Sequence, residues 1–364
     1  VILLAVVIFS PNAGAATFVP AGYQQVWGDE FSGDKLDATK WTFWAWRQGG
    51  RTVHPENVSV HDGAVHFVTT RGIDMKMVDP SAIYSLNKME YRYGYAEIRI
   101  KTKTNDAAWP AWWMKSNTDN KDRKDLDGEA EVDAFEACSN DGCGVADTER
   151  STLHKWLRYS DGEPNPGDFH GARSGLSTPV SQMDWITVGM LWTPDKIVTY
   201  VNGVEQKNSN FDLNTDIPTA QGPSGMAMSR YPLYIFLSGG ITGPVDIFFG
   251  GTCSPQVDYV RLYQPTDGSA TLYTAPTAED ATLVPAKIGA KYSAKLPIMS
   301  NPGDLTYALK SGSLPDGLAL DEKTGTITGA PTKSGKFTFA VTAHSDYIPT
   351  KDATANYEID VAAP

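Results

Sequence analysis

The sequence is poor in cysteine, histidine and basic residues, and it has no long apolar run. Three cysteines and six histidines occur among 364 residues, and none of them cluster at the spacing of a zinc site, which argues against a zinc enzyme. Lysine and arginine number 31 against 43 aspartates and glutamates, so the net charge of −12 disfavours nucleic acid and anionic membranes as partners. No segment approaches twenty apolar residues, and we expect no membrane span.

The cysteines and the first residues are compatible with an oxidising, extracellular location. Cys138 and Cys143 flank a turn-like Ser-Asn-Asp-Gly spacer short enough for a disulfide, although Cys253 leaves three pairings open. Residues 1–16 hold an apolar run of nine followed by small residues, as in a secretory signal peptide whose basic n-region is missing. We predict a protein that is secreted or held at the cell surface.

A helical period is missing over any long stretch, whereas short strand-like runs are frequent. The 33 glycines and 23 prolines favour many short strands joined by turns. Alternating runs at 91–103 and 256–264, with Asp-Gly and Asn-Gly pairs at 62–63 and 202–203, predict antiparallel strands and hairpins. The expected fold class is all-β, with a sandwich or barrel over residues 17–264.

The composition changes near residue 265. Residues 265–281 are rich in threonine, alanine and proline, which predicts an interdomain linker. Residues 282–364 hold short strands separated by glycine and proline, and they indicate a small immunoglobulin-like β-sandwich.

Four acids lie within the segment GEAEVDAFEACS, residues 128–139. Taken alone, this pattern fits a helical turn whose acids face water. As a strand, it places Glu131 and Asp133 on one face, and a one-residue bulge would turn Glu136 onto the same face. Crowded carboxyls disfavour complete ionisation, so one keeps its proton while another stays charged. Glycoside hydrolysis needs that combination of a proton donor and an attacking carboxylate.

Tryptophans precede this segment in WPAWWM, residues 109–114. On a strand, Trp109 and Trp113 share one face and Trp112 takes the other. Indoles beside carboxylates would give sugar rings a surface to stack on. The alternative is that tryptophan fills the core, which we expect of Trp112.

The chain resembles glycoside hydrolase family 16 over residues 23–264. The stretches that carry the resemblance occur in the family's order and are VWGDEFSG, KWTFW, ENVSVHDGAVHF, YGYAEIRIK, WPAWWMKS, EVDAFE, STLH, VNGVE and VDYVRLYQ. The E-x-D-x-x-E signature is the bulged version found in laminarinases, agarases, porphyranases and κ-carrageenases. The resemblance implies a β-jelly-roll with a concave sugar cleft and a retaining mechanism that needs no cofactor.

The resemblance also implies roles for individual residues. Glu131 would be the nucleophile, Asp133 its helper and Glu136 the general acid/base. The substrate-binding candidates are Trp113, Trp109, His154, Trp46, Arg51, Arg47 and Lys155. A structural calcium ion would be held by Asp258 and the carbonyl of Gly63, because oxygen ligands suit this metal.

The polysaccharide is ambiguous. WPAWWM is laminarinase-like, but Ala130 stands where laminarinases usually carry glycine. Arg47, Arg51 and Lys155 would suit sulfate groups, which arginine binds through paired hydrogen bonds. We predict a monomeric endo-acting hydrolase of an algal galactan of agar, porphyran or carrageenan type. A laminarinase of the same mechanism is the first alternative, and a non-catalytic carbohydrate-binding or adhesion protein is the second.

The C-terminal segment resembles immunoglobulin-like domains appended to bacterial secreted proteins. Its pieces LPDGL, TGTITG and PTKSG match the pattern of those domains. We expect this module to act as a spacer.

Overall fold

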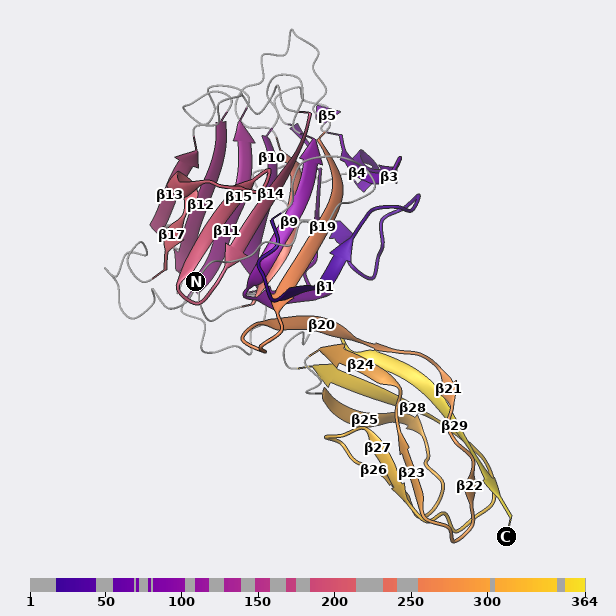
Figure 1. The fold of residues 1–364 in the computed structure, drawn as a ribbon. Coiled ribbons are helices and arrows are strands. Elements are labelled where there is room, and N and C mark those ends of the chain that lie inside the picture. Colours follow the sequence, from indigo (N-terminus) through magenta and orange to yellow (C-terminus); the bar gives the residue numbers. More distant parts are fainter. Residues whose placement is uncertain are drawn as a thin grey trace. The chain divides into compact units, whose positions relative to one another are not determined.

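The structure is a computed structural model, and it divides into two compact units (Figure 1). The N-terminal unit comprises Val1–Leu86 and Glu90–Thr271, and the C-terminal unit comprises Asn87–Met89 and Leu272–Pro364. The residues described are 18–43, 55–68, 70–71, 78–79, 81–101, 109–117, 128–138, 148–157, 168–174, 184–213, 232–240, 255–301, 305–345 and 351–363. Strands dominate both units, which confirms the all-β class.

The first sheet of the N-terminal unit contains the two alternating runs that the sequence predicts as strands. In spatial order its main path is β16 (Val204–Glu205), β15 (Lys196–Val201), β14 (Trp185–Trp192), β9 (Gly94–Lys101), β19 (Gln256–Pro265), β4 (Ala64–Phe67) and β3 (Val58–His61). Strand β1 (Tyr23–Asp29) pairs with β19, and β17 (Phe211–Asp212) pairs with β15. Single 3-10 turns, η1 (Pro55–Asn57) and η4 (Lys207–Ser209), lie between these strands in the chain.

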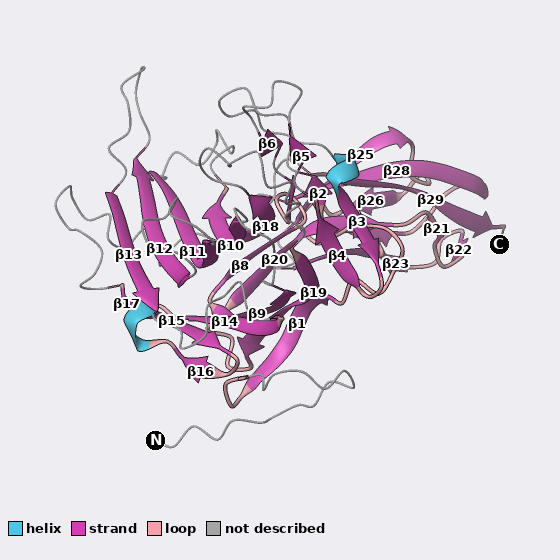
Figure 2. Ribbon diagram, turned by 90° about the horizontal axis from the view of Figure 1, so that it is seen from above, coloured by secondary structure: helices cyan, strands magenta, loops and turns pink. Residues whose placement is uncertain are grey.

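The second sheet carries the acidic segment. Its order up to β8 is β13 (Asp168–Ser174), β12 (Thr148–Leu157), β11 (Gly128–Cys138), β10 (Trp109–Ser116), β18 (Leu233–Gly240) and β8 (Met89–Arg92), with β7 (Ser81–Tyr84) beside β18 and β2 (Thr42–Phe43) beside β7. Strands β5 (Thr70–Arg71) and β6 (Val78–Asp79) form a separate pair. Figure 2 shows the row from β13 to β18 as one layer and the row from β15 to β1 as another.

The core of the N-terminal unit is built from the alternating apolar positions of these strands. In β18, for example, Leu233, Ile235 and Leu237 are at most 1 % exposed, while the residues between them take the opposite face. The corresponding fully buried residues of the first sheet are Val65, Ala96, Ile98, Val188, Met190, Val260 and Leu262. One face of the second sheet therefore packs into the core. The opposite face, here called the outer face, carries the side chains that alternate with these core residues.

Two predicted turns are confirmed. Asp62 and Gly63 join β3 to β4 with φ values of 53° and 75°, and Asn202 and Gly203 join β15 to β16 with φ values of 49° and 76°. Two successive positive φ angles suit the twist of a two-residue hairpin, and asparagine, aspartate and glycine tolerate them best. Among the residues that the structure describes, no helix is long and apolar enough to cross a bilayer.

The C-terminal unit is a small β-sandwich. Its larger sheet has the order β21 (Ala281–Thr282), β29 (Ala353–Ala362), β28 (Gly335–Ser345) and β25 (Leu305–Gly312), with β22 (Ala286–Lys287) also beside β29. The smaller sheet has the order β23 (Tyr292–Lys295), β27 (Thr326–Gly329) and β26 (Leu318–Leu320). Ile327, Val341, Ala343 and Ile359 are fully buried between them.

The linker expected at 265–281 is corrected to a shorter connection. Residues 266–270 form turns and bends, but β20 (Thr271–Ala278) is a strand that pairs with β24 (Ile298–Asn301). Leu272 and Tyr273 of β20 are only 7 % and 5 % exposed. The composition resembled that of a linker because threonine is common in both settings, yet threonine is also a good strand former.

Candidate active site

Strand β11 contains the one-residue bulge on which the interpretation of the acids depends. Against β10, Trp113 pairs with Asp133 and Trp112 pairs with Phe135, so Ala134 is the extra residue. Against β12, the regular register likewise breaks between Asp133 and Glu136. The segment is a bulged strand, and the helical alternative for it is excluded.

The bulge reverses the alternation of β11 after Asp133. Val132, Ala134 and Phe135 are at most 1 % exposed and belong to the core. In a regular strand, Phe135 would share the face of Glu131 and Asp133; the bulge sends it inward and places Glu136 on the outer face instead. The three acids of the signature therefore share one face, on which Asp133 is 6 % exposed and Glu131 and Glu136 are half-buried.

A lysine and an aromatic group lie beside the acids on strand β10. Lys115 pairs with Glu131, and its Nζ lies 3.8 Å from Glu131 Oε2. Trp113 pairs with Asp133, and residues directly opposite each other on neighbouring strands are within contact distance. If Glu131 is the attacking carboxylate, the ammonium group of Lys115 lies opposite it on β10. The indole of Trp113 lies two residues from Lys115 on that same strand.

The indole of Trp113 is held by strand β18. Its ring is stacked on Phe236 with centroids 3.9 Å apart and planes 3° apart, and its Nε1 donates to Ser238 Oγ at 3.3 Å. Tyr84 and Tyr234 lie against Phe236, with ring centroids at 5.3 and 5.1 Å. Because one indole face is covered and the N–H is engaged, Trp113 has a defined orientation in which it could contact a ligand.

The sequence predicted the faces of Trp112 and Trp113 correctly, and the side chain of Trp109 lies outside the described part of the chain. Trp112 and Met114 are 0 % exposed in the core, whereas Trp113 is half-buried on the outer face. Phe236, Tyr84 and Ser238 were missed, because their strands lie far from the acids in the chain. Only their alternation with buried residues in β18 and β7 could have indicated their face, and nothing in the sequence indicated which strands are neighbours.

The other substrate-binding candidates are defined less fully. The backbone of His154 pairs with Glu131, that of Lys155 with Ala130, and that of Trp109 with Gly240. Trp46, Arg47, Arg51, Cys143 and Cys253 lie outside the described residues. The expected roles of these residues and the disulfide of Cys138 stay predictions.

Of the predicted calcium ligands, Asp258 lies on β19 and Gly63 lies in the turn before β4, a strand that pairs with β19. Asp258 follows Val257, which pairs with Val65, two residues after Gly63. However, the Asp258 carboxylate accepts a hydrogen bond from Arg99, whose guanidinium also lies 4.8 Å from the Trp185 ring. Among the described residues no three acids, histidines or cysteines are grouped as metal ligands. The calcium site at Asp258 and the carbonyl of Gly63 stays a prediction.

Comparison with known proteins identifies the family. A sequence profile of the β-porphyranase A–D GH16 domain matches residues 23–265. The chain belongs to glycoside hydrolase family 16. The He_PIG immunoglobulin-domain profile matches residues 262–362 of this family 16 protein. Both resemblances noted in the sequence are thereby confirmed.

Relatives of this family 16 chain act on different polysaccharides. It is 25 % identical over 276 residues to glucan endo-1,3-β-glucosidase A1 of Niallia circulans, covering 67 % of this chain and 38 % of that protein. It is 26 % identical over 268 residues to keratan-sulfate endo-1,4-β-galactosidase of Sphingobacterium multivorum, covering 69 % and 57 %. The chain thus spans less than two thirds of either relative.

A solved structure shows the same fold. The κ-carrageenase of Pseudoalteromonas carrageenovora, in complex with a κ-carrageenan oligosaccharide, superposes with a TM-score of 0.52 at 21 % identity, over 70 % of this chain and 99 % of the other. The two-sheet architecture of the N-terminal unit is therefore the family 16 jelly-roll.

The bulge gives a direct test of how the acids are arranged. Deleting Ala134 is expected to leave a regular strand with the pairs Trp113–Asp133, Trp112–Phe135 and Ala111–Glu136 intact. The three acids then stay on one face, so we expect the variant to fold and to keep at least about a tenth of wild-type activity. The measurement is polysaccharide hydrolysis together with far-ultraviolet circular dichroism.

The matched control is deletion of Val132. This change makes Glu131 and Asp133 adjacent, so that they can no longer share a face. It is expected to give inactive or insoluble protein. A folded but inactive Ala134 deletion would contradict the arrangement.

Proposed function

We propose that the chain is a secreted, monomeric, retaining endo-β-glycosidase that hydrolyses an algal galactan of agar, porphyran or carrageenan type. The observation that carries the proposal is the β11 bulge, which places Glu131, Asp133 and Glu136 on one face beside Trp113. Glycoside hydrolysis with retention uses two carboxyl groups on one face, one as the nucleophile and one as the general acid/base. The predicted signal peptide at residues 1–16 supports secretion.

In the first half-reaction, a carboxylate oxygen of Glu131 attacks the anomeric carbon of the sugar. The bond from that carbon to the leaving oxygen breaks, and the leaving oxygen takes the proton of Glu136. In the second half-reaction, water gives a proton to Glu136 and its oxygen attacks the same carbon. The ester bond breaks in the same step, and its electron pair returns to Glu131. Two inversions give net retention.

Asp133 lies between the two glutamates on the outer face. It is only 6 % exposed, so its carboxyl is positioned by the surrounding protein more than by water. A third acid at this place would orient Glu131 and share the proton balance of the row. Glu131 and Glu136 remain the groups that react.

Trp113 would serve as the sugar platform of this site. Replacing Trp113 by alanine removes the stacked ring, and we expect KM to rise about tenfold with a smaller change in kcat. Ser238→Ala is the matched control, because it removes only the hydrogen bond to the indole and should raise KM less. A Trp113→Ala enzyme with unchanged KM on every hydrolysed polysaccharide would argue against the platform.

Two observations favour a galactan. The profile that matches residues 23–265 is that of β-porphyranases, and the Sphingobacterium relative is a galactosidase of a sulfated glycan. Arg47, Arg51 and Lys155 are the candidate sulfate ligands in the sequence. A β-1,3-glucanase is the second candidate, supported by the Niallia relative and by the WPAWWM motif.

A reducing-end assay of residues 17–364 on porphyran, agarose, κ-carrageenan, laminarin and lichenan tests the proposal. Hydrolysis of one of the three galactans is the expected result. Hydrolysis of laminarin or lichenan alone would keep the mechanism and replace the substrate class. Binding without hydrolysis on all five would favour the adhesion protein.

A further inference from the structure

Lys115 occupies a position that the catalytic scheme above does not use. It lies on the outer face of β10, paired with Glu131 of β11 on one side and with Tyr234 of β18 on the other. Its ammonium nitrogen is 3.8 Å from Glu131 Oε2. The lysine side chain is 26 % exposed and the glutamate side chain 14 % exposed, so the pair is partly shielded from water.

Two further acids and a second cation lie along the same part of the sheet, since Arg150 of β12 is the backbone partner of Glu136. Asp133 shares its strand and face, and Glu136 lies on the same face beyond the bulge. His154 of β12 is its backbone partner on the other side. Two nearby acids disfavour the charged form of Glu131, and a cation on β10 opposes them.

A cation at this distance affects the two half-reactions in opposite directions. It stabilises the carboxylate, which makes Glu131 a weaker nucleophile when the glycosyl ester forms. It also stabilises the carboxylate that is released when water breaks the ester, which makes Glu131 a better leaving group. The balance between formation and breakdown of the ester therefore depends on the charge of residue 115.

We propose that Lys115 is a positioning residue that keeps Glu131 in its carboxylate form and speeds breakdown of the glycosyl-enzyme. The inference rests on the proposed function, in which Glu131 is the nucleophile. Lys115 acts through Glu131, and the proton transfers remain those of Glu136 and water.

The experiment compares Lys115→Met, which keeps an unbranched side chain only one atom shorter, with Lys115→Arg, which keeps the charge. The rate constant kcat/KM is measured from pH 4 to 9 on whichever of porphyran, agarose, κ-carrageenan, laminarin and lichenan the wild type hydrolyses. In Lys115→Met the acidic limb of the profile is expected to move up by about one pH unit, and Lys115→Arg should restore it. The control is Lys101→Met, since Lys101 forms a similar partly exposed pair with Asp184, at 3.1 Å, on the other sheet.

A second readout follows the covalent intermediate. Protein quenched in acid during steady-state turnover is weighed as intact mass, and the fraction carrying a covalent oligosaccharide is expected to be at least about threefold higher in Lys115→Met than in wild type. An unmoved acidic limb with an unchanged covalent fraction overturns the role of Lys115, as does an equal shift in Lys101→Met.

Failure of the proposed function would look different. It would appear as a wild type that hydrolyses none of the five polysaccharides, or as full activity in a variant lacking the Glu131 carboxylate. Neither result depends on residue 115.

Discussion

Replacing Glu131 by glutamine is expected to lower kcat by at least about a thousandfold while leaving the melting temperature within about 2 °C of wild type. The amide fills nearly the same volume on strand β11, but it cannot form the glycosyl ester. Binding should persist, because the Trp113 platform is untouched. The measurement is reducing-end release, with affinity electrophoresis on the same polysaccharide as the binding readout.

Glu129→Gln is the matched control for this variant. Glu129 lies two residues earlier on the same strand and outside the E-x-D-x-x-E signature. The Glu129→Gln variant should therefore retain activity. Near wild-type turnover in Glu131→Gln would remove the nucleophile assignment. A stronger chemical test uses Glu131→Ala with sodium azide and a substrate with an activated leaving group. Azide entering in place of the carboxylate should give a product inverted at the anomeric carbon.

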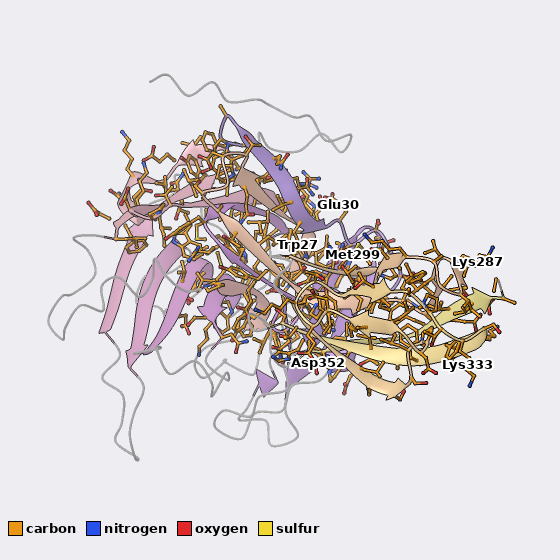
Figure 3. All side chains as sticks on the ribbon, turned by 90° about the horizontal axis from the view of Figure 1, so that it is seen from below. Trp27, Glu30, Lys287, Met299, Lys333 and Asp352 are labelled. Carbon is orange, nitrogen blue, oxygen red and sulfur yellow. The ribbon has the colours of Figure 1, made fainter. Side chains whose placement is uncertain are left out.

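The second large effect concerns a buried acid on the first sheet. Glu97 of β9 is 1 % exposed, and its carboxyl accepts hydrogen bonds from the hydroxyls of Tyr95 and Tyr259, each at 2.8 Å. Arg261 lies over the Tyr259 ring and is held by Glu30, the residue labelled just beyond the end of β1 in Figure 3. Burial raises the pKa of Glu97 from 4.5 to about 7, against the lowering effect of the two hydroxyls and Arg261.

This raised pKa makes stability depend on pH. Below pH 4.5 the carboxyl is protonated in both the folded and the unfolded chain, and burial carries no charge penalty. Between pH 4.5 and 7 the unfolded chain releases the proton first, so the free energy of unfolding falls by about 1.4 kcal/mol per pH unit. Above pH 7 both states are ionised and the loss is constant at roughly 3 kcal/mol. Glu97→Gln should abolish this loss.

Tryptophan fluorescence isolates the relevant unit, because all ten tryptophans lie between residues 27 and 192. Urea unfolding of wild type and Glu97→Gln is followed from pH 4 to 9, and the difference between them should grow through the window of pH 4.5 to 7. Tyr259→Phe removes one donor to the carboxylate, which raises the folded-state pKa further and should extend the upper end of the window to higher pH, while its lower end stays at pH 4.5. The exposed Glu205→Gln is the control. A parallel pH dependence in wild type and Glu97→Gln would contradict the assignment.

Much of the local structure was predictable because it depends on neighbours in the chain. The Asp62–Gly63 and Asn202–Gly203 turns follow from residues that tolerate positive φ. The alternation in Trp112 and Trp113 follows from the period of two in a strand. The linker at 265–281 was predicted too long, because the burial of Leu272 and Tyr273 depends on partners far along the chain.

For the acids of β11, the sequence determined which residues are present, and the tertiary structure determined how they are arranged. The residues Glu131, Asp133 and Glu136 and their spacing determined the family and the chemistry expected of it, since few functions need such a dense group of carboxyls. Their common face required a bulge, and the pairing of β11 with both β10 and β12 established that Ala134 is the extra residue. Lys115, Phe236 and Ser238 became part of the site only through strand order. Strand order depends on which apolar faces pack together over the whole domain. The sequence of a single strand therefore does not indicate its neighbours in the sheet.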